Sequence, residues 1–220
     1  GRFLFKGADF RVLPNGVDAG RFAYDPAVRG EKRRELGLGD GLVIGHAGRF
    51  AAVKNHGFLL EIFSEVLKSR PEAQLILAGT GELEAAVKEK ARAMGLSERV
   101  SFLGSREDME GLYQAMDIFV MPSLFEGFPG VGVEAQFAGL PCVFSDRITA
   151  ELDFSGRCGF LPLEGGAELW AEEILQRCGV QLPREGFYCP DYDIKVAAAA
   201  LEEYYIQLFP TASACRESAD

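Results

Sequence analysis

The sequence predicts an α/β fold in which a parallel sheet is covered by helices on both faces, the doubly wound arrangement. From residue 42 onward, short apolar runs alternate with longer amphipathic runs. The short runs are too short for helices and too uniformly apolar for half-exposed strands, so they fit strands buried on both faces. The long runs place apolar residues three and four positions apart, which is typical of helices that connect parallel strands.

The predicted elements follow one another in a regular order. The predicted strands are LVIGHAG (42–48), QLILAG (74–79), VSFLG (100–104), DIFVMPS (117–123), PCVFSD (141–146) and GRCGFLPL (156–163). The predicted helices are FLLEIFSEVLKSR (58–70), ELEAAVKEKARAM (82–94), DMEGLYQA (108–115), GVEAQFAG (132–139), AELWAEEILQRCG (167–179) and DIKVAAAALEEYYIQLF (193–209). Strand and helix alternation of this kind produces βαβ units and hence a parallel sheet.

The predicted organisation has four parts. Residues 1–40 form a connector that includes the first strand (RVLPNGVD, 11–18) and a basic helix (VRGEKRRELG, 28–37), and residues 41–190 form the sheet domain. Residues 191–209 form a terminal helix, and residues 210–220 form a loose polar tail. Because the chain begins with Gly1 rather than Met, we expect it to start partway through a longer gene product that contains a further domain.

Composition excludes several classes of protein. The chain has 220 residues, of which 48% are hydrophobic and 25% charged, so it can bury a core without assistance. It has no run of eighteen apolar residues and no secretory signal, which predicts a soluble cytoplasmic protein. The formal net charge of −10 argues against a broad nucleic-acid or anionic-membrane surface, because both would be repelled. Any phosphate site must therefore be local.

Cysteine and histidine chemistry is not predicted to carry the function. The five cysteines are widely spaced without a C-x-x-C pair, so we expect reduced thiols, with Cys142 packed in the core. The two histidines, His46 and His56, are too few for a typical zinc set and give little support to a histidine-based triad. We predict that His46 packs in a strand and that His56 lies at a helix start, and we predict no metal site.

Polar residues follow several predicted strands, at the edge where ligands bind in open α/β sheets. In chain order they are Arg49, Lys54, Ser105, Arg106 and Glu126. Arginine binds phosphate as a bidentate fork and lysine as a point charge, so Arg49 and Lys54 could hold a diphosphate. The alternative is that both are solvated loop cations. The set predicts a pocket for a phosphorylated polyol.

The segment SLFEGFPGVGVEAQFAGLP (123–141) adds a glycine-rich turn and a second carboxylate. The turn at residues 127–130 leads into a helix whose first N–H groups, at Gly130, Val131 and Gly132, would attract an anion, although an ordinary loop is the alternative. Along a helix, the eight positions from Glu126 to Glu134 span about 12 Å. Hydrolysing carboxylate pairs lie about 5 Å or about 6.5–9.5 Å apart, so hydrolysis is disfavoured. Two carboxylates that accept hydrogen bonds from an extended ligand fit better, with a capping Glu126 and a solvated Glu134 as the alternative.

Taken with VLPNGVD, GRFAAVKNH, LILAGTGEL and VSFLGSRED, this segment has the order and spacing of a known family. From about residue 11 to 209 the chain resembles the C-terminal half of the retaining glycosyltransferases of family 4, which are two-domain GT-B enzymes with Rossmann-like halves. The resemblance is nearest to bacterial exopolysaccharide and capsule glycosyltransferases. It implies that the sheet domain binds a nucleotide sugar, with a UDP-sugar as donor substrate and neither cofactor nor metal.

The resemblance also implies roles for individual residues. Arg49, Lys54 and Glu126 would be the catalytic set, with the two cations on the diphosphate and Glu126 on the donor sugar. Glu134 would accept from the ribose hydroxyls, and Arg106 would stack on uracil or else remain solvated. The full predicted site consists of Arg49, Lys54, Ser105, Arg106, Glu126, Gly127, Phe128, Pro129, Gly130, Val131 and Glu134. Gly130 and Gly132 replace bulkier apolar residues common in the family, which leaves sugar selectivity open.

The implied reaction is the transfer of a hexose, with retained configuration, to a polysaccharide or lipid-linked acceptor. The acceptor site would lie in an N-terminal domain absent from this chain, through which any contact with the inner face of the membrane would also occur. We therefore expect the isolated chain to bind a UDP-sugar weakly and to transfer nothing. The alternatives are an enzyme like the sugar-nucleotide 2-epimerases and a non-catalytic nucleotide-binding module that docks through its terminal helix.

Overall fold

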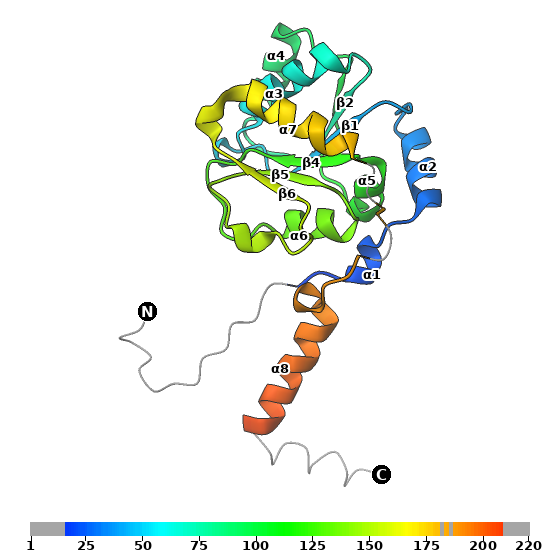
Figure 1. Ribbon diagram of the computed structural model, residues 1–220, viewed down its shortest axis with the longest axis vertical. Coiled ribbons are helices and arrows are strands. Elements are labelled where there is room, and N and C mark those ends of the chain that lie inside the picture. The colour runs from blue at the N-terminus through cyan, green and yellow to red at the C-terminus, as the bar shows by residue number, and fades with distance from the viewer. Residues whose placement is uncertain (1–15, 181–182, 185–186, 209–220) are drawn as a thin grey trace. The chain divides into compact units, whose positions relative to one another are not determined.

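The computed structural model describes residues 16–180, 183–184 and 187–208 and divides the chain into two compact units (Figure 1). One unit comprises residues 19–188, and the other comprises residues 1–18 with 189–220. Most of the strand expected at residues 11–18 and the tail expected at residues 210–220 lie outside the described residues.

The sheet of the larger unit is parallel throughout and has six strands in the order β3-β2-β1-β4-β5-β6. The strands are β1 (Val43–Ala47), β2 (Gln74–Ala78), β3 (Val100–Phe102), β4 (Ile118–Met121), β5 (Cys142–Ser145) and β6 (Cys158–Leu161). The chain moves outward from β1 to β3 and then returns to β4 on the other side of β1. The predicted doubly wound parallel sheet is therefore confirmed, with the switch in direction between β1 and β4.

Helices cover both faces of this sheet. The helices of the larger unit are α1 (Ala19–Phe22), α2 (Pro26–Glu35), α3 (His56–Ser69), α4 (Glu84–Ala93), α5 (Met109–Ala115), α6 (Gly130–Phe137) and α7 (Gly166–Gly179). Short 3-10 turns occur at η1 (Ala52–Lys54), η2 (Ala150–Leu152) and η3 (Leu163–Gly165). Helices α3, α4 and α7 lie on one side of the sheet and α5 and α6 on the other (Figure 1).

The packing of α3 shows why its sequence forms a helix here. Leu59, Ile62, Phe63 and Val66 are buried at three- and four-residue spacing, so one stripe of the helix faces the sheet and α7. Burying a side chain of this size stabilises a fold by about 1.5–3 kcal/mol. Trp170 of α7 is completely buried in the same cluster, and its indole N–H donates to the Pro162 carbonyl oxygen at 3.1 Å.

Helix α2 is the basic helix predicted at residues 28–37, and it belongs to the same compact unit as the sheet. Its N-cap residue Asp25 accepts a hydrogen bond from the Ala27 N–H at 2.7 Å, and Pro26 occupies the first helical position. Arg29 and Arg33 form ion pairs with Asp117, just before β4, at 2.5 and 2.6 Å. These contacts attach α2 to the amino-terminal edge of the sheet.

The smaller unit contains η4 (Pro190–Tyr192) and α8 (Ile194–Leu208), which corresponds to the predicted terminal helix. Val17 and Asp193 form a parallel bridge, in which the Ile194 N–H donates to the Val17 carbonyl at 2.9 Å. No helix in the described part of the chain is both long and apolar enough to cross a membrane.

Candidate functional site

The loops that follow β1, β2, β3 and β4 are joined to one another at the carboxyl edge of the sheet. The Phe50 N–H donates to the Thr80 carbonyl at 3.0 Å, and the Gly79 N–H donates to the Gly104 carbonyl at 2.7 Å. The Leu124 N–H donates to the Val53 carbonyl at 2.8 Å, which joins the loop after β4 to the turn η1. The predicted residues on these loops are therefore held in one region.

Glycine is required where the first two loops cross. Gly79 has a φ of +134°, and a side chain at this position would overlap the carbonyl oxygen of Gly48. A Cβ at Gly81 would lie 2.6 Å from the backbone nitrogen of Phe50. Only residues without a side chain permit this approach, which places Arg49 and Lys54 beside the β2–α4 loop.

Lys54 and Glu126 form an ion pair across the site. Lys54 Nζ lies 2.6 Å from Glu126 Oε1, and each side chain is 15% exposed. Lys54 comes from the β1–α3 connection and Glu126 from the loop after β4, so the pair joins two elements far apart in sequence. A cation and a carboxylate predicted to act on the same ligand are therefore adjacent.

Arg49 lies on the same connection as Lys54 but is far more exposed. Its Nη2 atom is 3.1 Å from Glu82 Oε2, and the two side chains are 73% and 54% exposed. An exposed ion pair of this kind contributes about 0–1 kcal/mol to stability, so Arg49 can exchange Glu82 for another anion at little cost. Arg49 is therefore available to bind an anion at this edge.

The predicted glycine-rich turn leads directly into α6. Gly127 and Gly130 are exposed, Phe128 and Val131 are half-buried, and Pro129 is buried. Pro129 is the N-cap residue and has no side-chain acceptor for the first turn. The prediction of a free N–H at Gly132 is wrong, because this group donates to the Pro129 carbonyl at 3.0 Å. In the described part of the chain the N–H groups of Gly130 and Val131 have no acceptor, as an anion-binding helix start requires.

Glu134 lies on the second turn of α6 and contacts Tyr113 of α5. The Tyr113 hydroxyl donates to Glu134 Oε2 at 2.8 Å and lies 3.3 Å from the Val131 carbonyl oxygen. Burial raises the pKa of Glu134, while the hydrogen bond from Tyr113 opposes this rise. The carboxylate is thus partly removed from water at one end of the glycine-rich segment.

Ser105 and Arg106 occupy the loop after β3. Ser105 is exposed. Arg106 donates from Nε and Nη2 to the two carboxylate oxygens of Asp108 at 2.7 Å, and Nη2 also reaches Glu35 at 3.3 Å. These hydrogen bonds are made by the N–H groups at the edge of the guanidinium and not by its planar faces. Stacking of a face on a base stays a prediction.

The two histidines pack against each other, and the described cysteines are free thiols. His46 and His56 are buried, with ring centroids 4.7 Å apart, and His46 Nδ1 bonds with the Val120 carbonyl at 2.8 Å. The described cysteines are unpaired, and Cys142 is buried in β5 as expected. The described residues contain no group of three or more metal-ligating side chains.

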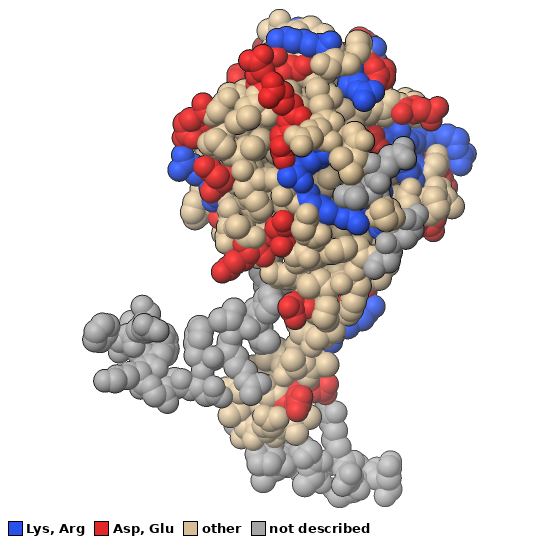
Figure 2. All heavy atoms as spheres, viewed as in Figure 1, with Lys and Arg blue, Asp and Glu red and all other residues tan. Residues whose placement is uncertain are grey.

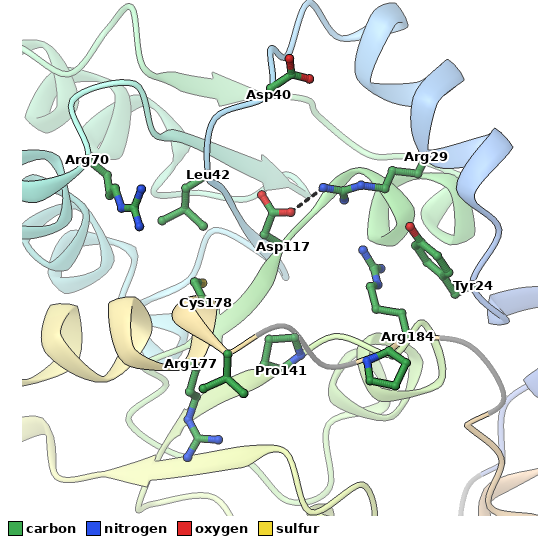
Figure 3. A pocket seen from close by; sticks show the side chains of 13 residues that line it. Tyr24, Arg29, Asp40, Leu42, Arg70, Asp117, Pro141, Arg177, Cys178 and Arg184 are labelled. Atoms are coloured by element: carbon green, nitrogen blue, oxygen red, sulfur yellow. Dashed lines mark hydrogen bonds and ion pairs between the residues drawn. The ribbon is translucent and has the colours of Figure 1, made fainter.

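A cavity of about 810 Å³ lies at the opposite, amino-terminal edge of the sheet (Figure 3). Two of the arginines that line it are engaged by the fold: Arg29 and Arg184 donate to carbonyl oxygens at the end of α5, including that of Met116 at 2.8 and 2.9 Å. Cations at this edge compensate the negative ends of helix dipoles. We therefore assign the cavity's charge to stability rather than to the predicted site.

The face of the molecule drawn in Figure 2 carries charges of both signs. On the face drawn in Figure 2, acidic and basic side chains are interspersed rather than gathered into one continuous basic surface. The cations at the carboxyl edge therefore belong to a protein whose formal net charge is −10.

Two residues that contact the site were not among the predicted ones. Glu82 pairs with Arg49, and Tyr113 bonds to Glu134. Glu82 lies in the GTGEL segment, and its acidic charge can be seen in the sequence. That Arg49 is its neighbour depends on the order of the strands in the sheet, which the sequence pattern does not give. Tyr113 is completely buried and fits the apolar pattern of its helix, so only the three-dimensional contact distinguishes it from the core.

Fold and site together define a Rossmann-like α/β protein in which predicted site residues such as Lys54 and Glu126 meet at the carboxyl edge of the sheet. The chain belongs to the family described as glycosyl transferases group 1, whose model matches residues 41–178. The family confirms the resemblance found in the sequence, and the similar solved structures agree with the C-terminal domain of a GT-B protein.

Individual relatives agree with this assignment. EpsF of Bacillus subtilis strain 168, which is provisionally named a glycosyltransferase, is 40% identical over 194 residues, covering 85% of this chain and 50% of EpsF. An Escherichia coli UDP-Gal:alpha-D-GlcNAc-diphosphoundecaprenol alpha-1,3-galactosyltransferase is 37% identical over 61% of this chain and 36% of the relative. Anabaena Alr3699/HepE in complex with UDP-glucose is 26% identical, with a TM-score of 0.76 over 91% of this chain and 59% of HepE. The chain thus spans about half the length of EpsF.

Proposed function

We propose that this chain is the donor-binding half of a retaining glycosyltransferase that moves a hexose from a UDP-sugar to a polysaccharide or lipid-linked acceptor. The observation that carries the proposal is the gathering of Arg49, Lys54, Glu126 and the start of α6 at one edge of the sheet. Two cations and two unpartnered backbone amides suit a diphosphate, and the carboxylate suits sugar hydroxyls.

Relatives support the choice of nucleotide and product class. HepE was solved with UDP-glucose, and the Escherichia coli relative is named as a UDP-galactose enzyme acting on a diphosphoundecaprenol acceptor. EpsF is 40% identical to this chain in an alignment that covers 85% of it. A uridine diphosphate donor is therefore the first ligand to test.

In the proposed reaction the bond between the sugar and the diphosphate breaks and the acceptor oxygen forms the new bond on the same face. The departing diphosphate gains negative charge, which Arg49 and Lys54 stabilise because they are already positioned at the edge. The same diphosphate accepts the acceptor's proton. We propose that these side chains make a divalent metal unnecessary, so that chelation leaves transfer by the full-length enzyme unchanged.

The decisive experiment is calorimetric titration of this chain with UDP, comparing the parent with Arg49→Ala. Loss of a charge-assisted contact costs about 1.5–3 kcal/mol, so we expect about 10- to 100-fold weaker binding. Arg92→Ala is the matched control, because Arg92 forms an exposed ion pair with Glu89 on α4 and removal changes net charge equally. Equal binding by the parent and Arg49→Ala, or no binding by the parent, would overturn the proposal.

A second experiment tests the division of labour. Activity is measured for this chain and for the chain extended through its upstream coding sequence, using a panel of UDP-sugars. We expect transfer only by the extended protein, because we propose that the acceptor binds in the other half. Transfer by the isolated chain would refute this division while leaving donor binding intact.

A further inference from the structure

The contact between Tyr113 and Glu134 points to a positioning role for Tyr113, which the match to the family does not identify. We infer that the Tyr113 hydroxyl orients the Glu134 carboxylate so that its second oxygen accepts from the ribose hydroxyls of a bound nucleotide. The inference rests on the proposed function and deepens it. Tyr113 donates to Glu134 Oε2 at 2.8 Å, and Oε1 accepts no hydrogen bond within the described part of the chain.

Tyr113 is itself fixed in place. Its side chain is completely buried, and its ring makes edge contacts with Phe22 of α1 and Phe119 of β4 at centroid distances of 5.9 Å. The hydroxyl also lies 3.3 Å from the carbonyl of Val131, in the first turn of α6. The buried Tyr113 side chain therefore fixes the positions of the Glu134 carboxylate and the first turn of α6 relative to the sheet.

Electrostatics gives the hydrogen bond a further consequence. Burial raises the pKa of Glu134, and the Tyr113 hydrogen bond and the charge of Arg21 lower it, while Glu110 raises it. Arg21 Nη2 donates to Glu110 Oε2 at 2.8 Å, so these paired charges act on Glu134 in opposite directions. Tyr113 is therefore the main neutral group that favours the ionised carboxylate, the form that can accept from both ribose hydroxyls.

The alternative is that Tyr113 only joins α5 to α6. That role predicts lower stability on substitution and an equal loss of binding at every pH. A positioning role predicts instead a binding defect that grows as the pH falls, because without the hydrogen bond Glu134 becomes protonated at a higher pH. The pH profile separates the two.

The test uses Tyr113→Phe, which keeps the ring and its packing, in UDP titrations between pH 5.5 and 8. The quantity of interest is the ratio of parent to variant affinity, in which protonation of UDP itself cancels. We expect about a 3-fold loss at pH 8, from the missing hydrogen bond to a charged group, and a larger loss as the pH is lowered toward 5.5. An unchanged affinity, or an equal loss at all pH values, would overturn the inference.

Two control variants sharpen the result. Gln136→Met removes buried hydrogen bonds to the Gly132 and Leu152 carbonyls from the same helix without touching Glu134, so its effect should not depend on pH. In a Glu134→Gln background, Tyr113→Phe should no longer change the pH profile. A pH-dependent defect in either case would contradict the inference.

A ligand-free measurement separates this inference from the proposed function. Carbon-13 NMR titration of the Glu134 carboxyl should show a higher pKa in Tyr113→Phe than in the parent. If the parent fails to bind UDP but this pKa rises, the proposed function fails in this chain while the orienting contact stands. If UDP binds and the pKa is unchanged, the inference fails while the proposed function stands.

Discussion

The ammonium of Lys54 lies 2.6 Å from the carboxylate of Glu126, and both side chains are only 15% exposed. The pair closes the region in which the diphosphate and sugar of a donor are proposed to bind. Each member keeps the other's charge compensated while the site is empty. Donor binding then adds phosphate oxygens around Lys54 and sugar hydroxyls around Glu126.

The first prediction concerns the stability of this pair. Lys54→Met leaves Glu126 shielded from water without its cation, so we expect a loss of about 1–3 kcal/mol in the free energy of unfolding. Glu126→Gln in the same protein should recover part of the loss, because the uncompensated charge is then absent. Urea unfolding of both single variants and the double variant measures this coupling.

The exposed pair of Arg49 and Glu82 provides the control for that measurement. Arg49→Met and Glu82→Gln should each change the unfolding free energy by no more than about 0.5 kcal/mol, because the side chains are 73% and 54% exposed. Equal coupling energies for the exposed and the shielded pairs would contradict this assignment.

A second prediction compares two glycines. Gly79→Ala should destabilise the protein by at least about 2 kcal/mol, because its φ is +134° and its Cβ would overlap the Gly48 carbonyl. Gly30→Ala should instead stabilise it by about 0.5–1 kcal/mol, because Gly30 lies within α2 and nothing is within 4 Å of its Cβ. Thermal unfolding of both variants measures the difference, and destabilisation by Gly30→Ala would refute the second half.

The fold was predictable because its signals are local. Uniformly apolar runs identified the strands, and the spacing of residues such as Leu59, Ile62 and Phe63 identified the crossover helices. Boundaries differ by a few residues, as at α3, where the predicted start at residue 58 becomes His56.

The site was predictable only in part, for a physical reason. Parallel strands all end at the same edge, so polar residues after each strand must gather there, as Lys54 and Glu126 do. Which side chains touch depends on strand order and loop conformation, which no local pattern encodes. Glu82 beside Arg49 and Tyr113 beside Glu134 are contacts of this kind.

A third prediction distinguishes the two edges of the sheet. At the amino-terminal edge, the Asp117 carboxylate accepts hydrogen bonds from Arg29, Arg33 and the Val43 N–H at 2.5, 2.6 and 2.7 Å. Asp117→Asn should lower the unfolding free energy by about 2–3 kcal/mol, because two arginines lose their carboxylate. Its affinity for UDP should stay within about 2-fold of the parent under conditions where both are folded, since the proposed site is at the other edge.

The control for this prediction is Asp40→Asn, because Asp40 also lines the amino-terminal cavity but is exposed. We expect a change in unfolding free energy within about 0.5 kcal/mol. A large loss of UDP affinity in folded Asp117→Asn would instead indicate that the cavity takes part in nucleotide binding.

The last prediction concerns pH. Burial is the main reason that the pKa of His46 falls to about 4 and that of His56 to about 3. Nearby positive charge contributes less: Lys54 acts on both rings, and His46 acts on His56. Both imidazoles are therefore neutral in the folded chain at a pH where the unfolded chain, with a pKa of about 6.5, already binds protons. Protonation then favours the unfolded state, so stability is full above about pH 6.5 and falls as the pH drops toward 4.

The slope reaches about 1.4 kcal/mol per pH unit for each imidazole, and the chain has only these two. His56→Phe keeps a ring stacked on Phe50, whose centroid lies 4.1 Å from that of His56, and removes one titrating group. Urea unfolding between pH 7.5 and 5.5 should therefore show about half the parent's loss of stability. Phe50→Leu is the control, because it disturbs the same packing but retains both imidazoles and should retain the parent's slope. A His56→Phe slope equal to the parent's would show that protonation of His56 does not govern acid sensitivity in this range.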